Sequence, residues 1–138
     1  LPTYLHPMVV HFPIALFITA FLFEVISLII KNDNLHEAAI YMYVTASLIT
    51  PFVLRTGLWE AEKVNLSHPI LAEHAQYATW LMWTSLMSLP VLWFIHRELK
   101  KCFKIVFIIL LLTTTLLVAF TGDKGGQMVY EYGVGVEK

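Results

Sequence analysis

Charged side chains are scarce in this chain. Lys, Arg, Asp and Glu make up 14% of its 138 residues, whereas 58% are hydrophobic. Because a soluble domain carries about a quarter charged residues, this composition excludes an ordinary water-soluble domain. Nine basic and ten acidic side chains leave a net charge of −1. That balance argues against nucleic-acid binding, which needs a basic face.

Cysteine is also nearly absent, because Cys102 is the single one. It excludes a disulfide framework within the chain, and the sequence holds no CxxCH motif for covalent haem attachment. Phosphate-binding loops, dinucleotide fingerprints and nucleophile–base pairs are missing as well. These absences disfavour a stand-alone enzyme acting on a soluble substrate.

The sequence does contain four long apolar windows, at residues 7–30, 38–58, 75–95 and 102–121. A membrane-spanning helix needs about 20 mainly apolar residues, and the windows lack the alternation of barrel strands. Short connections make successive helices antiparallel neighbours. We therefore predict an all-α membrane protein, with one transmembrane four-helix bundle over residues 1–138.

The two halves of the chain carry similar landmarks, spaced 62, 63 and 65 residues apart. The matched landmarks are His6-Pro7 with His68-Pro69, His11 with His74, and Thr56-Gly57 with Thr121-Gly122. The spacing predicts two helical hairpins, residues 1–66 and 67–138, duplicated in parallel orientation. Such halves are related by a pseudo-two-fold axis along the membrane normal.

Four of the six histidines are expected at one membrane face: His6, His11, His68 and His74. A histidine before proline can simply cap a helix or lie among the headgroups, which would explain His6 and His68. It explains His11 and His74 less well, because polar residues inside a span usually face a cavity or a partner.

Imidazole is a common metal ligand, and two histidines from two helices can hold haem iron from both sides. On a helix, residues five apart differ by about 140° and about 7.5 Å. His6 and His11 therefore suit two sites at different depths. We predict a deeper pair, His11 with His74, and an outer pair, His6 with His68. That arrangement corresponds to two bis-His haems b, or to one haem and a second use for the outer pair.

Further polar residues have two readings each. Arg55 is expected at the same face, where it either pairs with haem propionates or extends to the interface as an ordinary arginine. One of Glu60, Glu62 and Glu73 could orient a histidine ring. Glu24, inside the first window, either serves a proton pathway or quinone site or makes a buried hydrogen bond, with Thr113-Thr114-Thr115 as a candidate partner. His36 and His96 are expected at the opposite face.

Lysine and arginine in the loops indicate the orientation, because they are enriched on the cytoplasmic side. The dense basic turn at residues 96–101 is placed in the cytoplasm, so both termini face the periplasm. The glycine-rich tail, residues 122–138, is expected to pack over the outer face or against a partner, where it could cap the histidine cavity. The alternative is a flexible C-terminus.

The opening His6-Pro7-Met8-Val9-Val10-His11-Phe12-Pro13 resembles that of a bacterial four-helix membrane family, domain of unknown function 2231, marked by HPxxxHFPIAL. The Thr56-Gly57 helix end and the tail also resemble this pattern, over nearly the whole chain. The resemblance implies the fold and a bacterial inner-membrane setting. It implies no activity, although partnership with cytochromes would favour haem.

The resulting hypothesis is a haem-b electron-transfer subunit of a larger respiratory or photosynthetic complex, an electron carrier rather than an independent enzyme. Its expected partners are the lipid bilayer, other membrane subunits, a periplasmic c-type cytochrome and quinone. Two alternatives remain: a non-haem copper or zinc protein, and a purely structural assembly subunit.

Overall fold

The computed structural model describes residues 5–63 and 67–134, which are helical almost throughout. The helices are α1 (Leu5–Val9), α2 (His11–Ile30), α3 (Asp33–Lys63), α4 (Pro69–Glu98) and α5 (Lys100–Tyr130). With α1 and α2 taken together, the described residues contain four helices long and apolar enough to cross a membrane. The predicted all-helical class with four spans is confirmed.

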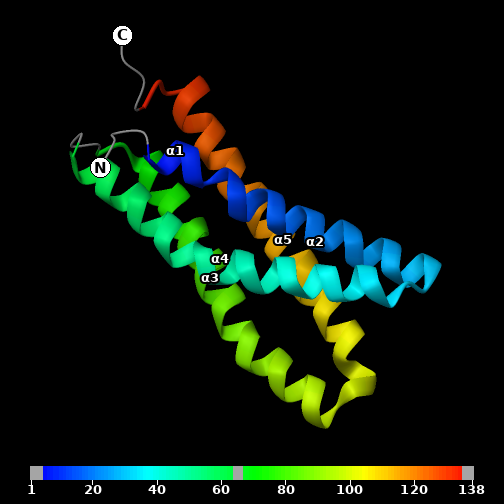
Figure 1. Ribbon diagram of the computed structural model, residues 1–138. Helices are drawn as coiled ribbons and strands as arrows, with labels where there is room; N and C mark the ends of the chain where they lie inside the picture. Colours follow the sequence, from blue (N-terminus) through cyan, green and yellow to red (C-terminus); the bar gives the residue numbers. More distant parts are fainter. Residues whose placement is uncertain (1–4, 64–66, 135–138) are drawn as a thin grey trace.

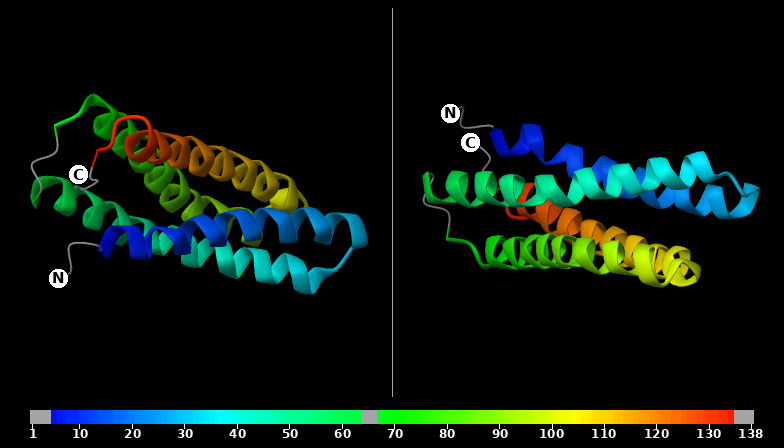
Figure 2. Two further views of the ribbon diagram at one scale, coloured as in Figure 1. Left: turned by 90° about the horizontal axis from the view of Figure 1, so that it is seen from above. Right: turned by 60° about the horizontal axis from the view of Figure 1, so that its bottom comes forward.

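The helices form two antiparallel hairpins that cross each other (Figure 1). Helix α2 packs mainly on α3, and α4 packs mainly on α5, whereas α2–α5 and α3–α4 contacts join the hairpins more sparsely. Figure 2 shows the two hairpins as two layers, with the start of α1 and the end of α5 at the same end of the molecule. We name this the terminal end, and the opposite end, where each hairpin turns, the turn end.

The first hairpin turns within two residues. Lys31 ends α2 in the left-handed conformation, with φ 54° and ψ 50°, and its N–H donates to Ser27 O. Asn32 then caps α3, because its Oδ1 accepts from the backbone N–H groups of Asn34 and Leu35 at 3.0 and 3.3 Å. Both caps satisfy backbone groups that a helix end leaves unpaired, so the chain reverses sharply here.

Tyr43 is the hub of the core, because it touches all three other long helices. Its ring packs edge to face on Phe17 of α2 and on Phe107 of α5, with ring centroids 5.7 and 5.5 Å apart. Its hydroxyl lies 2.7 Å from Ser88 Oγ of α4. The Tyr43 side chain is fully buried, so it joins the two hairpins through both packing and a hydrogen bond.

The helices extend beyond the predicted windows. Helix α3 continues to Lys63 rather than ending near Leu58, and α5 continues through Gly122, Gly125 and Gly126 to Tyr130. The expected glycine-rich tail is therefore helix over most of its length, and residues 135–138 lie outside the described part. Glycine costs a helix only about 1 kcal/mol per residue relative to alanine, so these glycines do not stop α5.

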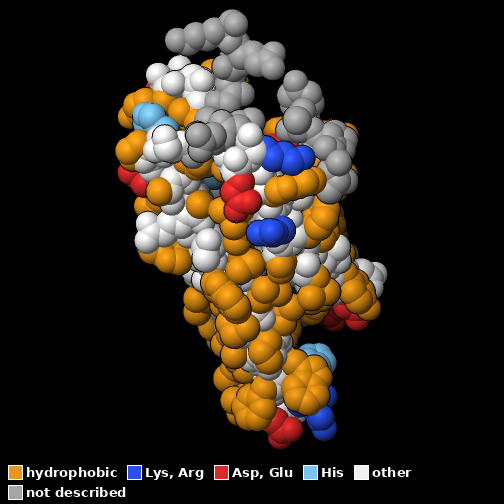
Figure 3. Space-filling model, turned by 90° about the vertical axis from the view of Figure 1, so that its left-hand side faces the viewer, with side chains coloured by type: hydrophobic (Ala, Val, Ile, Leu, Met, Phe, Trp, Pro, Cys, Tyr) orange, Lys and Arg blue, Asp and Glu red, His pale blue; other side chains and the backbone are white. Residues whose placement is uncertain are grey.

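Exposed large apolar side chains cover much of the surface, among them Ile29, Tyr41, Trp93 and Ile105. In Figure 3 hydrophobic side chains dominate the middle of the visible face, and charged side chains gather in its upper part and at its lower tip. This distribution suits lipid around the middle and water at both ends.

Candidate functional site

His6 is fixed at the terminal end by the last turns of α3. Its backbone N–H donates to Glu60 Oε1 at 2.8 Å. Its ring Nδ1 lies 3.1 Å from both Val53 O and Thr56 Oγ1. Because a carbonyl oxygen only accepts, the bond to Val53 places the proton on Nδ1. The Nε2 atom of His6 therefore keeps its lone pair.

His74 repeats this arrangement in the second hairpin. Its Nδ1 lies 2.9 Å from Thr121 O of α5, so the proton again belongs on Nδ1 and the lone pair on Nε2. Histidines that bind metals commonly donate the other ring N–H to a backbone carbonyl, which sets the tautomer and orients the ring. His6 and His74 both have this arrangement.

Two glycines allow these rings to lie against the helices. A Cβ placed on Gly57 would be 2.9 Å from His6 Cε1, and one on Gly125 would be 3.4 Å from His74 Cε1. The first distance is a clash and the second is ordinary contact at its tight limit. Gly57 is therefore needed for the position of the His6 ring, and Gly125 is the corresponding, less crowded position.

The imidazoles of His6 and His74 face each other across the terminal end. Their ring centroids are 6.5 Å apart, and their planes make an angle of 81°. Metal–nitrogen bonds of about 2.0–2.1 Å would put the centroids of two imidazoles on opposite sides of one ion roughly 6 Å apart. The observed centroid separation is close to this value, so His6 and His74 are near enough to hold one metal ion between them.

Within residues 5–63 and 67–134, no three His, Cys, Asp or Glu side chains are grouped as ligands for one ion. A closed structural zinc site uses four protein ligands. A porphyrin supplies four nitrogens itself and asks the protein for only two axial ligands. The two imidazoles therefore match the number of ligands that a haem would require from the protein.

Equivalent contacts in the two hairpins recur at a spacing of 68 residues. This offset relates His6 to His74, Val53 to Thr121, and Gly57 to Gly125. Buried positions follow the same offset. The pairs buried in both halves are Pro13/Leu81, Phe17/Ser85, Ala20/Ser88, Glu24/Leu92, Ala39/Phe107, Tyr43/Leu111, Ala46/Thr114 and Thr50/Val118. The predicted offsets of 62 to 65 residues therefore require correction.

The predicted histidine pairs are also corrected, because the ring that faces His74 is that of His6. His11 is exposed, and its Nδ1 forms a hydrogen bond with Pro7 O, four residues earlier in the chain, at 2.8 Å. His68 caps α4 by accepting from the Ile70 N–H at 3.2 Å, and its ring lies 4.6 Å from that of Tyr132. The two His-Pro pairs thus have different roles: His6 lies inside α1, whereas His68 precedes α4.

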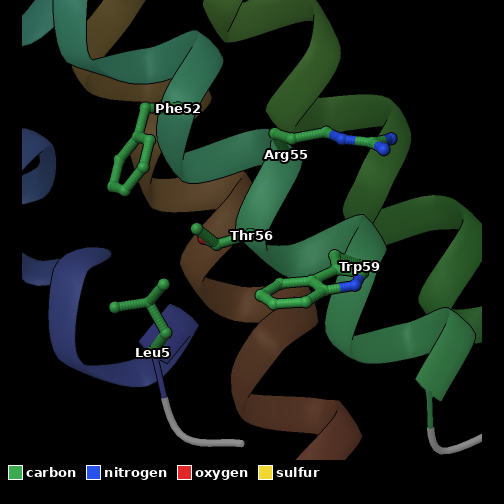
Figure 4. A pocket seen from close by; sticks show the side chains of 5 residues that line it. All are labelled: Leu5, Phe52, Arg55, Thr56 and Trp59. Carbon is green, nitrogen blue, oxygen red and sulfur yellow. The ribbon is translucent and has the colours of Figure 1, made fainter. Parts of the chain in front are cut away.

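Arg55 lines an open groove of about 260 Å³ next to the His6 site. In Figure 4 the side chains of Leu5, Phe52, Thr56 and Trp59 border this groove, and the Arg55 side chain extends away from Leu5 and Phe52. Thr56 belongs to both places, because its Oγ1 is the neighbour of His6 Nδ1. Arg55 is exposed, and it lines the groove beside the His6 site.

The acidic residues of the terminal end act differently from the prediction. Glu60 accepts from the His6 backbone rather than from a ring, and Glu73 pairs with Lys124 at 2.9 Å. The groups that orient the rings are the carbonyls of Val53 and Thr121, together with the Thr56 hydroxyl. Contacts to backbone carbonyls cannot be recognised from residue types. The equal spacing of Gly57 and Gly125, which lie against the two histidine rings, is the sequence signal that could have located these contacts.

These features define a four-helix membrane protein with a pair of facing imidazoles at one end. The chain belongs to the family described as Predicted membrane protein (DUF2231), whose model matches residues 2–138. The family resemblance carried by the opening motif is thereby confirmed. Comparison with curated proteins and with solved structures finds no match.

Proposed function

We propose that this protein is a haem-b-binding electron-transfer subunit whose axial ligands are His6 and His74. The observation that carries the proposal is the pair of imidazoles at a centroid distance of 6.5 Å, each with its Nδ1 bonded to a carbonyl and its Nε2 without a hydrogen bond to any residue that the structure describes. Two such imidazoles would hold the haem, which would supply one-electron transfer without a catalytic acid or base from the protein.

One haem is proposed rather than two, because His11 and His68 do not form a second facing pair. His11 bonds Pro7 O, whereas His68 accepts from the Ile70 N–H and lies against Tyr132. The apolar side chains bordering the groove beside Thr56 suit the edge of a large flat ring. Arg55 is the proposed partner of a haem propionate, because its exposed guanidinium can form two parallel hydrogen bonds with a carboxylate.

The setting of the protein follows from its charges. We propose a bacterial inner membrane, with the turn end in the cytoplasm and both termini in the periplasm. Lysine and arginine are dense at the turn end, which includes Lys31, Arg97, Lys100, Lys101 and Lys104. A haem at the terminal end would then exchange electrons with a periplasmic c-type cytochrome, with quinol or with neighbouring membrane subunits.

The test is the optical spectrum of the purified protein, oxidised and reduced, together with carbon monoxide binding. The intact protein should show a six-coordinate low-spin haem b that does not bind carbon monoxide. His6→Ala and His74→Ala should each open one coordination position, giving a haem that binds carbon monoxide or is lost. His11→Ala and His68→Gln are the matched controls and should keep the spectrum unchanged.

Four outcomes would contradict the proposal. Haem absent from protein purified with haem supplied would remove its basis, and an unchanged low-spin spectrum in His6→Ala and His74→Ala would place the haem elsewhere. Stoichiometric copper or zinc without a haem spectrum would favour the non-haem alternative. A protein without haem or metal that still assembles normally when both histidines are replaced would favour a structural subunit.

A further inference from the structure

Glu24 is an acidic side chain inside the bundle, far from the histidine pair. Its exposure is 0%, and among the described residues no other Asp, Glu, Lys or Arg side chain is buried. It is 18 residues from His6, which corresponds to about 27 Å along a helix. An ionisable residue within a membrane-spanning helix is costly and generally has a partner and a function.

The partner of Glu24 is His36, at the start of α3. His36 Nδ1 lies 2.7 Å from Glu24 Oε2, and the His36 side chain is 13% exposed. The sequence suggested the threonines of α5 instead, but Thr113 and Thr114 donate to carbonyls of their own helix. The carboxylate is therefore joined to an imidazole that reaches the protein surface.

The pair is enclosed by aromatic rings and incompletely satisfied. The His36 ring packs edge to face on Phe103 and Phe107, with ring centroids 5.7 and 5.9 Å apart. Glu24 Oε1 is buried without a hydrogen-bond partner. A buried carboxylate with one bare oxygen in apolar surroundings is costly unless its charge is compensated, and the His36 imidazole is in position to compensate it.

Among the described residues, the charged groups near the pair lie toward the turn end, and the titratable Tyr43, whose ring contacts Phe107, lies on the core side. On α3 they are Asp33 and Glu37, both exposed; on α5 Lys104 pairs with Asp33 at 3.3 Å; and on α4 the exposed His96 ring lies 5.3 Å from Phe103. Lys31 closes α2 at the same end. In the other direction the neighbours are the core rings of Phe17, Tyr43 and Phe107.

We propose that Glu24 and His36 form a proton-binding site that exchanges with water at the turn end. The Nδ1–H group of His36 donates a hydrogen bond to Glu24 Oε2 and keeps its proton, and Nε2 accepts and releases the exchangeable proton. Uptake of one proton changes the pair from a net charge of −1 to a neutral ion pair, and release reverses that change. No oxidant, reductant or metal takes part, so the site is independent of the proposed haem.

The test follows the ring nitrogens of His36 by ¹⁵N NMR, in histidine-labelled protein in lipid nanodiscs. The pH is varied between about 5 and 8, the range in which histidine charge changes are expected. The signals of His36 are assigned by their loss in His36→Gln. In the intact protein both ring nitrogens should become protonated within this range, and Glu24→Gln should leave His36 neutral at a pH where the unsubstituted protein is protonated.

Glu37→Gln is the matched control, because Glu37 is the exposed carboxylate next to His36 in the chain. It should leave the His36 titration unchanged, since water and salt screen an exposed charge. A His36 ring that never takes up a proton in the unsubstituted protein would overturn the proposal. Equal titration in Glu24→Gln and the unsubstituted protein would also overturn it.

The access route has its own measurement. In sealed vesicles with the protein inserted in one orientation, infrared difference spectra report the Glu24–His36 pair after an acid pulse on one side. A pulse on the turn-end side should change the bands that Glu24→Gln removes, and a pulse on the terminal side should not. The reverse result would contradict exchange at the turn end.

Discussion

At the scale of single residues, Gly57 decides where the His6 ring can lie. Replacing it by alanine would place a Cβ 2.9 Å from His6 Cε1, so the ring must move away from Val53 O and from its place opposite His74. Overpacking costs about 1–3 kcal/mol, which exceeds the gain of up to about 1 kcal/mol from alanine in a helix. We expect Gly57→Ala to lower unfolding stability by about 1 kcal/mol and to weaken haem retention.

The chain supplies its own control for this substitution. Gly126 also lies within a helix, α5, but a Cβ there would meet nothing within 4 Å. Gly126→Ala should therefore keep or slightly raise stability, as measured by reversible denaturant unfolding in detergent micelles. Equal effects of the two substitutions would show that the glycines act through helix propensity and not through the histidine ring.

The residues of the site were only partly predictable from sequence. His6 and His74 were both recognised as candidate ligands, because polar side chains at the ends of apolar helices are conspicuous. Their pairing was wrong, because the His-Pro dipeptides that suggested it have different structural roles, one inside α1 and one before α4. The pairing depends on the register between hairpins, which is set by buried positions 68 residues apart.

At the scale of an element, α3 tolerates an internal proline because a neighbouring side chain replaces the hydrogen bond that the proline cannot donate. Pro51 has no N–H, so Ser47 O loses its usual helical partner. Thr50 Oγ1 donates to this oxygen at 2.7 Å. Thr50→Val should therefore leave a buried carbonyl unpaired and lower stability by about 1–2 kcal/mol.

A double-substitution cycle separates this bond from general packing at position 50. In Pro51→Ala the backbone N–H of residue 51 becomes available to Ser47 O, so the Thr50 hydroxyl is no longer required. Thr50→Val should then cost clearly less in the Pro51→Ala background than in the unsubstituted protein. Equal costs in both backgrounds, measured by the same unfolding assay, would refute this replacement.

The existence of each helix could be predicted from apolar length, but its ends could not. Helix α5 runs 31 residues, about 46 Å, well beyond the roughly 30 Å of a bilayer core. Its last turns are held by tertiary contacts, including the Thr121–His74 bond and the Lys124–Glu73 ion pair. Hydropathy identifies only the part of a helix that lies in lipid, so it does not predict how far the helix continues into the aqueous layer.

At the scale of the whole molecule, the hairpins are two units joined through Tyr43. Each hairpin buries its largest surface within itself, since α2 packs mainly on α3 and α4 mainly on α5. We therefore expect residues 1–65 and 66–138, produced as separate chains in one membrane, to associate and co-purify. If the proposed haem is present, the reassembled halves should bind it, because each half contributes one imidazole.

Tyr43 provides the decisive variants for this experiment. Tyr43→Ala removes a fully buried ring that contacts Phe17 and Phe107, and it should abolish co-purification. Tyr43→Phe loses only the bond to Ser88. Interhelical hydrogen bonds in membranes contribute about 0.6 kcal/mol on average, so this variant should still assemble. Tyr41→Ala is the control at a 71% exposed ring, and should have no effect. Assembly of Tyr43→Ala as efficient as that of Tyr41→Ala would mean that the hairpins are held together by the terminal-end contacts instead.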